Sequence, residues 1–269
     1  MASTVSDGGR DPDRYRAAQR GLTRLLLRDL RSARRLLVPT RLRQAMPDWI
    51  AAVHALIGQY GSASSALGAE WYDAQRAAAA VRGPFTVPVA DAPPEEQTEA
   101  SLRWATRDLW PAPSGETARQ EPIEARLETA FTLTDGVAQK LVADQGRQTV
   151  RQAVRQDREA VAYARAAALG GCFFCKLMAS RGAVYKDAQT AGRDANDRFS
   201  GDASVVKFHN NCHCTIVPVF RGQRFELSPH ASEWDRLYQE YAAGRPGDQL
   251  RLFRRALAEH DSHPLPGSH

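Results

Sequence analysis

Apolar residues recur at helical spacing over most of the chain. Leu22, Leu26 and Leu30 are each four positions apart, with arginines between them. This period predicts a helix over residues 15–37 that ends before Pro39.

Two glycines fall inside later stretches of the same period. A second helix is expected from near Pro47, a residue favoured in a first helical turn, and Gly61 is expected to bend or break it. Residues 122–145 and 147–168 are expected to be two helices, separated at Gly146. The chain is therefore predicted to be mainly α.

Turn residues and polar stretches divide the chain into segments. Residues 84–94 hold four prolines, which predicts an extended linker. The only runs typical of strands are residues 205–209 and 214–220, which are short and rich in β-branched side chains. The expected segments are a disordered arm over 1–13, a helical region over 14–83, the linker over 84–94, a helical region over 95–168, a small α+β module over 169–222, C-terminal helices over 223–260 and a loose tail over 261–269.

Positive charge is concentrated at the N-terminus. The whole chain has a formal net charge of +5, whereas residues 1–45 hold eleven Arg, no Lys and four Asp and thus carry +7. A basic arm of this kind suits nucleic acid or an acidic protein surface, and it is equally compatible with a solvated helix face.

From the sequence we expect no association with a membrane. No uninterrupted apolar run is long enough to cross a bilayer, and the first residues lack the apolar core of a signal peptide. We therefore expect the protein to be made in the cytoplasm.

All four cysteines lie between positions 172 and 214. Cys172 and Cys175 form a C-x2-C pair, and after a long gap His209, Cys212 and Cys214 form H-x2-C-x-C. Two such pairs in a cytoplasmic chain are typical of tetrahedral Zn²⁺ with sulfur and nitrogen ligands. Five candidates compete for four positions. Cys172, Cys175 and Cys212 are expected in either set, and His209 or Cys214 completes it, so the C-terminal module is predicted to contain a structural zinc ion.

An enzymatic site is less well supported. A nucleophilic Cys or Ser180 near His209 would be a protease alternative, but no G-x-S-x-G surrounds Ser180, and the chain has no H-E-x-x-H. No catalytic dyad or triad can be assembled, so no catalytic residue is assigned.

Two stretches carry a family resemblance. AVAYARAAALGGCFFCKLMASRGAVYKDAQTAG (160–192) and FHNNCHCTIVPVF (208–220) resemble the C-terminal module of Mu F-type minor head proteins of tailed phages. The version in phages of actinobacteria, often labelled "capsid maturation protease", is the most similar. GQYGSASSALGAEWYDAQRAAA (58–79) resembles the helical region of that family, so the likeness covers most of residues 20–220. The matching positions are Cys172, Cys175, Leu177, Ala179, Ser180, Arg181, Gly182, Val184, Tyr185, His209, Cys212, His213, Cys214, Pro218, Val219 and Phe220.

The resemblance implies a virion-associated protein. Such a protein would be a minor capsid or head-morphogenesis component inside the head, assembled in the host cytoplasm beside portal and major capsid proteins. The Arg-rich N-terminal arm could then contact packaged DNA, and a DNA-binding virion protein acting in packaging or ejection is a further alternative. Residues 194–206 look like an insertion relative to shorter members of that family.

Overall fold

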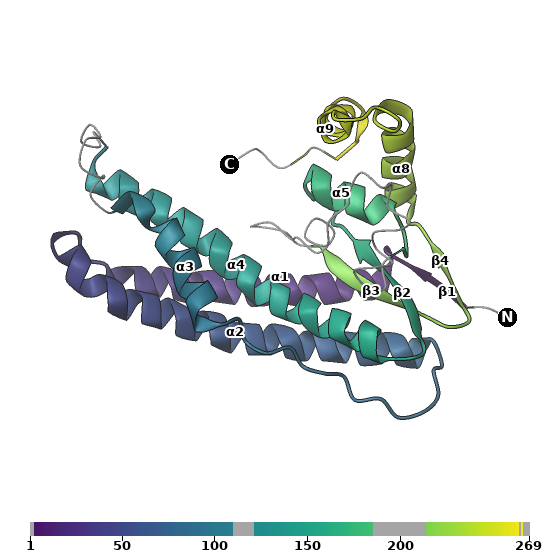
Figure 1. The fold of residues 1–269 in the computed structure, drawn as a ribbon, viewed down its shortest axis with the longest axis horizontal. Helices are drawn as coiled ribbons and strands as arrows, with labels where there is room; N and C mark the ends of the chain where they lie inside the picture. The colour runs from purple at the N-terminus through teal and green to yellow at the C-terminus, as the bar shows by residue number, and fades with distance from the viewer. Residues whose placement is uncertain (1–2, 110–120, 185–213, 264, 266–269) are drawn as a thin grey trace.

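The fold is mainly helical, as the apolar period predicts. The computed structural model describes residues 3–109, 121–184, 214–263 and 265. Three long helices lie side by side in an elongated bundle, and α3 lies across α2 and α4 (Figure 1). The bundle elements are α1 (Arg10–Ala33), η1 (Arg34–Leu36), η2 (Pro39–Arg41), α2 (Leu42–Ala78), α3 (Glu95–Ala105), η3 (Arg107–Leu109) and α4 (Ile123–Gln156). No helix in the described ranges is both long and apolar enough to span a lipid bilayer.

The glycines that were expected to interrupt helices are contact points between α2 and α4. Both helices continue through Gly61 and Gly146. A Cβ atom at Gly68 would lie 2.7 Å from the carbonyl oxygen of Gly146, and one at Gly146 would lie 2.7 Å from that of Ser64. The predicted breaks at Gly61 and Gly146 were wrong because the small residues serve close helix packing rather than a turn.

A smaller α+β module covers one end of the bundle (Figure 1). Its elements are β2 (Ala160–Ala166), α5 (Phe173–Ser180), β3 (Thr215–Phe220), β4 (Gln223–Glu226), α8 (Pro229–Tyr241) and α9 (Gln249–His260). Within the described residues the strands form two ribbons: β2 pairs antiparallel with β3, and β4 pairs parallel with β1 (Ser3–Ser6). The strand predicted over 214–220 is confirmed, whereas residues 205–209 lie outside the described residues.

The helix predicted over 147–168 ends earlier than expected. α4 stops at Gln156, and residues 160–166 form β2, with Tyr163 opposite Pro218 and Ala166 opposite Thr215. The alanines of β2 favour a helix locally, but every residue of β3 is buried and its backbone needs a pairing partner. This tertiary demand overrides the local preference.

The expected disordered arm over residues 1–13 is ordered from Ser3 onward, because β1 pairs with β4 and α1 begins at Arg10. The Asp7 carboxylate, only 2% exposed, accepts hydrogen bonds from the backbone N–H of Ser228 at 2.7 Å and from its hydroxyl at 3.0 Å. These contacts tie the N-terminus to the start of α8.

The linker over 84–94 has neither helix nor strand, and part of it packs against the bundle. Val87 and Ala90 are buried, and the N–H of Ala90 donates to the Thr149 hydroxyl of α4 at 3.0 Å. The linker therefore runs along the bundle as a fixed connection between α2 and α3.

The buried apolar side chains of the described residues form two clusters. The bundle core lies between α1, α2, α3 and α4. The module core joins the other end of the bundle to the strands, α5, α8 and α9. Principal members of the bundle core are Leu26, Leu30, Trp49, Val53, Ile57, Leu102, Leu127, Phe131 and Leu141. Principal members of the module core are Tyr15, Trp71, Tyr72, Val154, Tyr163, Cys175, Cys214, Phe220, Trp234 and Phe253.

Candidate metal centre

The C-x2-C pair lies at the beginning of α5. Cys172 is the N-cap residue, and the backbone N–H of Cys175 donates to its sulfur at 3.4 Å. A bond of this kind and a position at a helix N-terminus both favour a negatively charged sulfur. Gly171 permits the turn before α5, since a Cβ there would lie 2.8 Å from the carbonyl oxygen of Ala168. The local backbone thus presents two thiols at the start of one short helix.

The antiparallel ribbon brings the second cysteine segment to the same end of the module. Ala166, the last residue of β2, is paired with Thr215, the first residue of β3. Since Cys214 directly precedes β3 and Cys172 follows β2 by six positions, both segments leave the ribbon at this end. Cys175 and Cys214 are each 2% exposed, and Cys172 packs against the same module core.

The bundle fixes the position of Cys214. The guanidinium of Arg147 in α4 donates from Nε to the carbonyl oxygen of Cys214 at 2.9 Å and from Nη1 to Asp144 at 2.8 Å. The indole N–H of Trp71 in α2 donates to the carbonyl oxygen of Ile216 at 2.8 Å. Two long helices therefore hold the strand that follows the second cysteine segment.

Only part of the predicted ligand set lies within the described residues. Cys172, Cys175 and Cys214 are described, whereas His209 and Cys212 lie outside the described residues. Within the described part, no three His, Cys, Asp or Glu side chains are grouped closely enough to hold a metal ion. Thiolates at the end of a strand ribbon suit Zn²⁺ chemically, and a complete site requires His209, Cys212 or both.

Ser180, the serine of the protease alternative, occupies a structural position. It is the last residue of α5, is 4% exposed, and donates its hydroxyl hydrogen bond to the carbonyl oxygen of Leu177 at 2.9 Å. This is the usual bond of a serine in a helix and does not activate the oxygen as a nucleophile.

A buried ion pair beside the cysteines was not predicted. Lys176 is fully buried, and its ammonium donates to Asp261 at 2.6 Å and to the carbonyl oxygen of His263 at 3.0 Å. The indole N–H of Trp234 donates to the same Asp261 oxygen at 3.0 Å, and the ammonium lies 5.4 Å from the indole ring centroid. The expectation of a loose tail over 261–269 is therefore wrong at Asp261–His263, because these residues satisfy a charge that would otherwise be buried alone.

The surroundings of Asp261 act on its pKa in opposite directions. Burial raises the pKa, but hydrogen bonds from Lys176, His263 and Trp234 and the positive charge of Lys176 lower it, and the net result is a pKa below the ordinary value. The carboxylate therefore stays ionised at neutral pH and binds α5 to the segment after α9.

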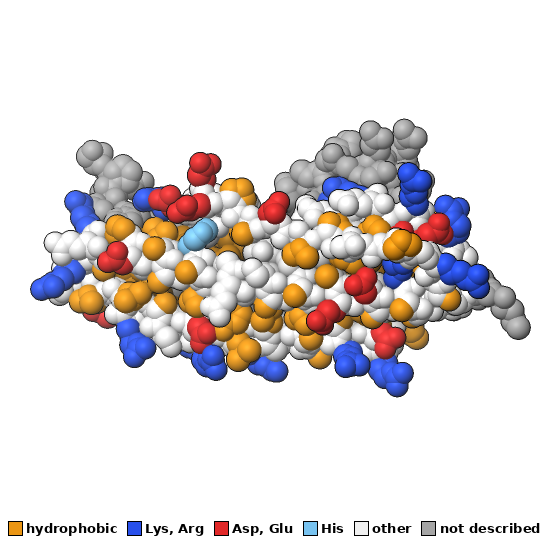
Figure 2. Space-filling view, turned by 90° about the horizontal axis from the view of Figure 1, so that it is seen from below, with side chains coloured by type: hydrophobic (Ala, Val, Ile, Leu, Met, Phe, Trp, Pro, Cys, Tyr) orange, Lys and Arg blue, Asp and Glu red, His pale blue; other side chains and the backbone are white. Residues whose placement is uncertain are grey.

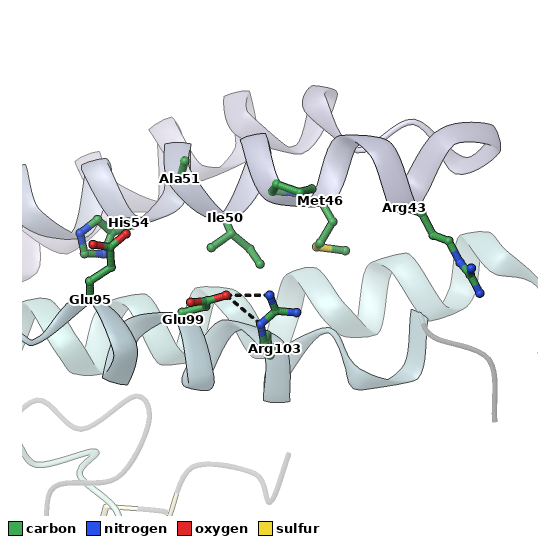
Figure 3. A pocket seen from close by; sticks show the side chains of 9 residues that line it. Arg43, Met46, Ile50, Ala51, His54, Glu95, Glu99 and Arg103 are labelled. Carbon is green, nitrogen blue, oxygen red and sulfur yellow. Dashed lines mark hydrogen bonds and ion pairs between the residues drawn. The ribbon is translucent and has the colours of Figure 1, made fainter. Parts of the chain in front are cut away.

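A groove of about 320 Å³ lies elsewhere, between α2 and α3 (Figure 3). Met46 and Ile50 contribute apolar side chains, while Glu99 and Arg103 form an ion pair at 2.6 Å on the opposite wall. The Nδ1 atom of His54 is buried there without a hydrogen-bond partner among the described residues. This groove has no signature in the sequence, because its lining residues come from two helices separated by the linker.

Comparisons with known proteins identify a family. Residues 9–241, from the start of α1 to the end of α8, match the family described as VG15 protein. Comparison with curated proteins gave no match, and comparison with solved structures gave none. The match covers well over half of the chain and includes both the bundle and the cysteine-bearing helix. The chain therefore belongs to the VG15 protein family, a phage-related virion protein family.

Proposed function

We propose that this protein is a minor capsid or head-morphogenesis protein of a tailed phage, located inside the virion near the portal. Family membership over residues 9–241 supports a virion protein. The resemblance of the cysteine segments to Mu F-type minor head proteins supports the more specific role, with the portal and the major capsid protein as partners. The long bundle offers helix faces for docking, and the module closes one end of it.

The proposed role includes a structural zinc ion. Four of Cys172, Cys175, His209, Cys212 and Cys214 would hold it, and it would join the start of α5 to the segment that precedes β3. The observation that carries this proposal is the antiparallel pairing of Ala166 with Thr215, because the segment that leads to Cys172 and the segment that ends at Cys214 both leave the ribbon at this end. A structural zinc uses protein ligands in all four positions and contributes folding free energy directly.

Zinc content measured on the purified full chain tests the metal site. We expect about one zinc per chain in the wild type, and loss of the metal in Cys172→Ser. Ser180→Ala is the matched control, because it changes a buried hydroxyl in the same helix and should keep the zinc. Wild-type protein without zinc would refute the proposed structural zinc site.

Two further variants assign the ligands. Cys214→Ser and His209→Ala should differ, since only one of the two side chains is needed beside Cys172, Cys175 and Cys212. The variant that keeps its zinc identifies the side chain that is not a ligand. Loss of zinc in both variants would mean that one of the three assumed common ligands does not bind the metal.

The virion role is tested separately, by mass spectrometry of purified particles and of DNA-free heads from the parent phage. We expect the protein in both, at far lower abundance than the major capsid protein, and in a complex with the portal protein when the two are co-expressed. Absence from particles would refute the role.

The protease alternative makes a different prediction. Incubating the full chain with unprocessed major capsid protein should cause no cleavage if the role is structural. Cleavage that is lost in Cys172→Ser or in Ser180→Ala would support the enzyme.

A further inference from the structure

The solvent face of α1 carries a continuous row of arginines. At 100° per residue, Arg14, Arg20, Arg24, Arg28 and Arg31 fall within an arc of roughly 120°. All five are exposed, whereas Leu26 and Leu30 on the opposite face are buried in the bundle core. From the first to the last arginine the row extends about 25 Å at a rise of about 1.5 Å per residue. We call these five residues the arginine row.

Most of this charge is not neutralised within the molecule. Among the described residues, Arg14, Arg20, Arg24 and Arg31 have no ion pair with a carboxylate. The acidic residues of α1 are engaged by other arginines: Asp11 lies 4.0 Å from Arg10, Asp13 pairs with Arg16, and Asp29 pairs with Arg28 and accepts a hydrogen bond from Tyr60. Figure 2 shows a row of Lys and Arg side chains projecting along the lower edge of the molecule.

Arginines of the C-terminal helices are arranged differently. Arg236 lies 2.7 Å from Glu233 and 2.5 Å from Glu240, Arg251 lies 3.0 Å from Asp248, and Arg255 lies 2.7 Å from Glu259. These three side chains are exposed, yet each has a carboxylate within one helical turn. The remaining arginine of α9, Arg254, has no ion pair among the described residues and lies over the ring of Phe173. Single exposed arginines without an ion pair also occur on other described helices, as at Arg43 in α2 and Arg155 in α4, but α1 carries four of them along one face.

The composition of the α1 face fits a phosphate backbone better than a protein surface. Protein interfaces are usually centred on aromatic or large apolar anchors, and the exposed residues between the arginines of the row include no aromatic side chain and only one large apolar one, Leu25. Guanidinium groups bind phosphate oxygens with two parallel hydrogen bonds. The row is somewhat shorter than one turn of B-DNA, which rises about 34 Å, so a single duplex could contact its whole length.

We propose that the arginine row on α1 is a binding surface for the phosphate backbone of double-stranded DNA, without preference for base sequence. The row positions the long axis of the bundle on the duplex and leaves the module at the end of the bundle for other contacts. The proposal deepens the proposed virion role, which supplies packaged DNA as the ligand, but binding by the purified chain does not depend on that role. A negative result would therefore leave the virion proposal intact.

The test compares two triple variants of the full chain that lose the same positive charge. R14Q/R20Q/R24Q removes unpaired arginines from the row, and R236Q/R251Q/R255Q removes paired arginines from α8 and α9. Binding to a labelled duplex of about 30 base pairs, long enough to exceed the row, is measured by fluorescence anisotropy over a range of salt concentrations. Circular dichroism and thermal unfolding of each variant check that the fold is retained.

We expect wild-type affinity to fall steeply with salt, because phosphate contacts release counterions. Each lost phosphate contact lowers the slope of log K against log salt by about 0.9, so the α1 variant should lose about 2 to 3 units of slope. At about 0.1 M salt it should bind at least about 30-fold more weakly, whereas the α8/α9 variant should stay within about two-fold of the wild type.

Three outcomes would overturn the proposal. Wild-type protein that does not bind the duplex at low salt would do so, and so would equal losses in the two variants, which would indicate an effect of net charge alone. The third is binding to polyglutamate that depends on the arginine row while DNA binding does not, which would assign the surface to an acidic protein. A change of base sequence at constant length should leave the affinity unchanged.

Discussion

The bundle core and the module core are built from different interactions. In the bundle core, apolar side chains meet at helical spacing, and α2 and α4 approach each other through Gly61, Gly68 and Gly146. The module core contains apolar residues too, but polar contacts between distant parts of the chain cross it. Lys176 pairs with Asp261, 85 positions away, and Asp7 binds Ser228, 221 positions away.

A third long-range contact lies where the two regions meet. Asp157, after α4, accepts hydrogen bonds from Arg76 at 2.9 Å and from the Tyr72 hydroxyl at 3.1 Å, both in α2. The stability of the bundle thus depends mainly on close packing, whereas the stability of the module depends on buried charged groups that need their partners. Substitutions that change the side-chain volume by a similar amount should consequently change the free energy of unfolding differently in the two regions.

The largest effect is expected from breaking the Lys176–Asp261 pair. Lys176→Met keeps most of the side-chain volume but leaves a buried carboxylate without its cation, and we expect a loss of about 3 to 5 kcal/mol in the free energy of unfolding. K176M/D261N removes both charges while keeping an oxygen for the indole N–H of Trp234, so the double variant should recover more than half of the loss. Urea unfolding of the wild type, both single variants and the double variant measures the coupling between the two residues.

The coupling should depend on pH in a defined direction. The pKa of Asp261 in the folded protein lies below its ordinary value of 3.8, so its stabilisation is present above pH 3.8 and is lost as the pH falls through the folded pKa. The stability difference between wild type and Asp261→Asn should shrink over that acidic range. If the losses in unfolding free energy of Lys176→Met and Asp261→Asn simply add up in the double variant at neutral pH, the buried pair does not stabilise the module.

An intermediate effect is expected from two glycines in the same helix. A Cβ atom at Gly68 would meet the carbonyl oxygen of Gly146 at 2.7 Å, whereas one at Gly58 would meet nothing within 4 Å. Gly68→Ala should therefore cost about 1 to 3 kcal/mol, because α2 and α4 must separate. Gly58→Ala should gain up to about 1 kcal/mol from helix propensity.

Thermal and urea unfolding of these two variants compare close packing with helix propensity at fixed side-chain size. A gain in stability for both would mean that α2 and α4 can move apart at no cost, and that the bundle is less tightly specified than its glycines indicate. A loss for both would point to a general intolerance of substitution in α2.

The same contrast explains which features were predictable from the sequence. A helix over most of α1 and the strand β3 follow from local spacing, and both are confirmed. Gly61 and Gly146 were misinterpreted because a glycine that breaks a helix and a glycine that permits close packing look alike without the partner helix. Strand β2 was missed because its alanines suit a helix, and only β3 requires it to be extended.

In the candidate site, the sequence located Cys172, Cys175 and Cys214 in one module but gave no signal for the residues around them. Lys176 looks like an ordinary polar position of a helix, and nothing near Asp261 indicates burial. Asp261 also lies after position 241, where the family match ends. Long-range pairs of single residues have no period or spacing, so pattern analysis cannot find them.

The smallest effect on the free energy of unfolding is expected from a substitution at Asp7, whose pKa is shifted in the opposite direction to that of Asp261. Burial raises the pKa of Asp7, and hydrogen bonds from Ser228 and the charge of Arg16 only partly oppose this, so its pKa lies above the ordinary value of 3.8. A carboxyl group of this kind favours folding most below pH 3.8, and its contribution is lost as the pH rises through the folded pKa.

Asp7→Asn keeps an oxygen that can accept the backbone N–H of Ser228, and it removes the charge that burial disfavours. We expect the free energy of unfolding at neutral pH to change by less than about 1 kcal/mol. Wild type should lose stability relative to the variant as the pH rises from below 3.8, which is opposite in sign to the behaviour expected for Asp261→Asn. Urea unfolding of both variants over the same pH series makes this comparison directly. A loss of more than about 2 kcal/mol at neutral pH would show that the ionised form of Asp7 stabilises the start of α8, and that the module relies on charge at both of its termini.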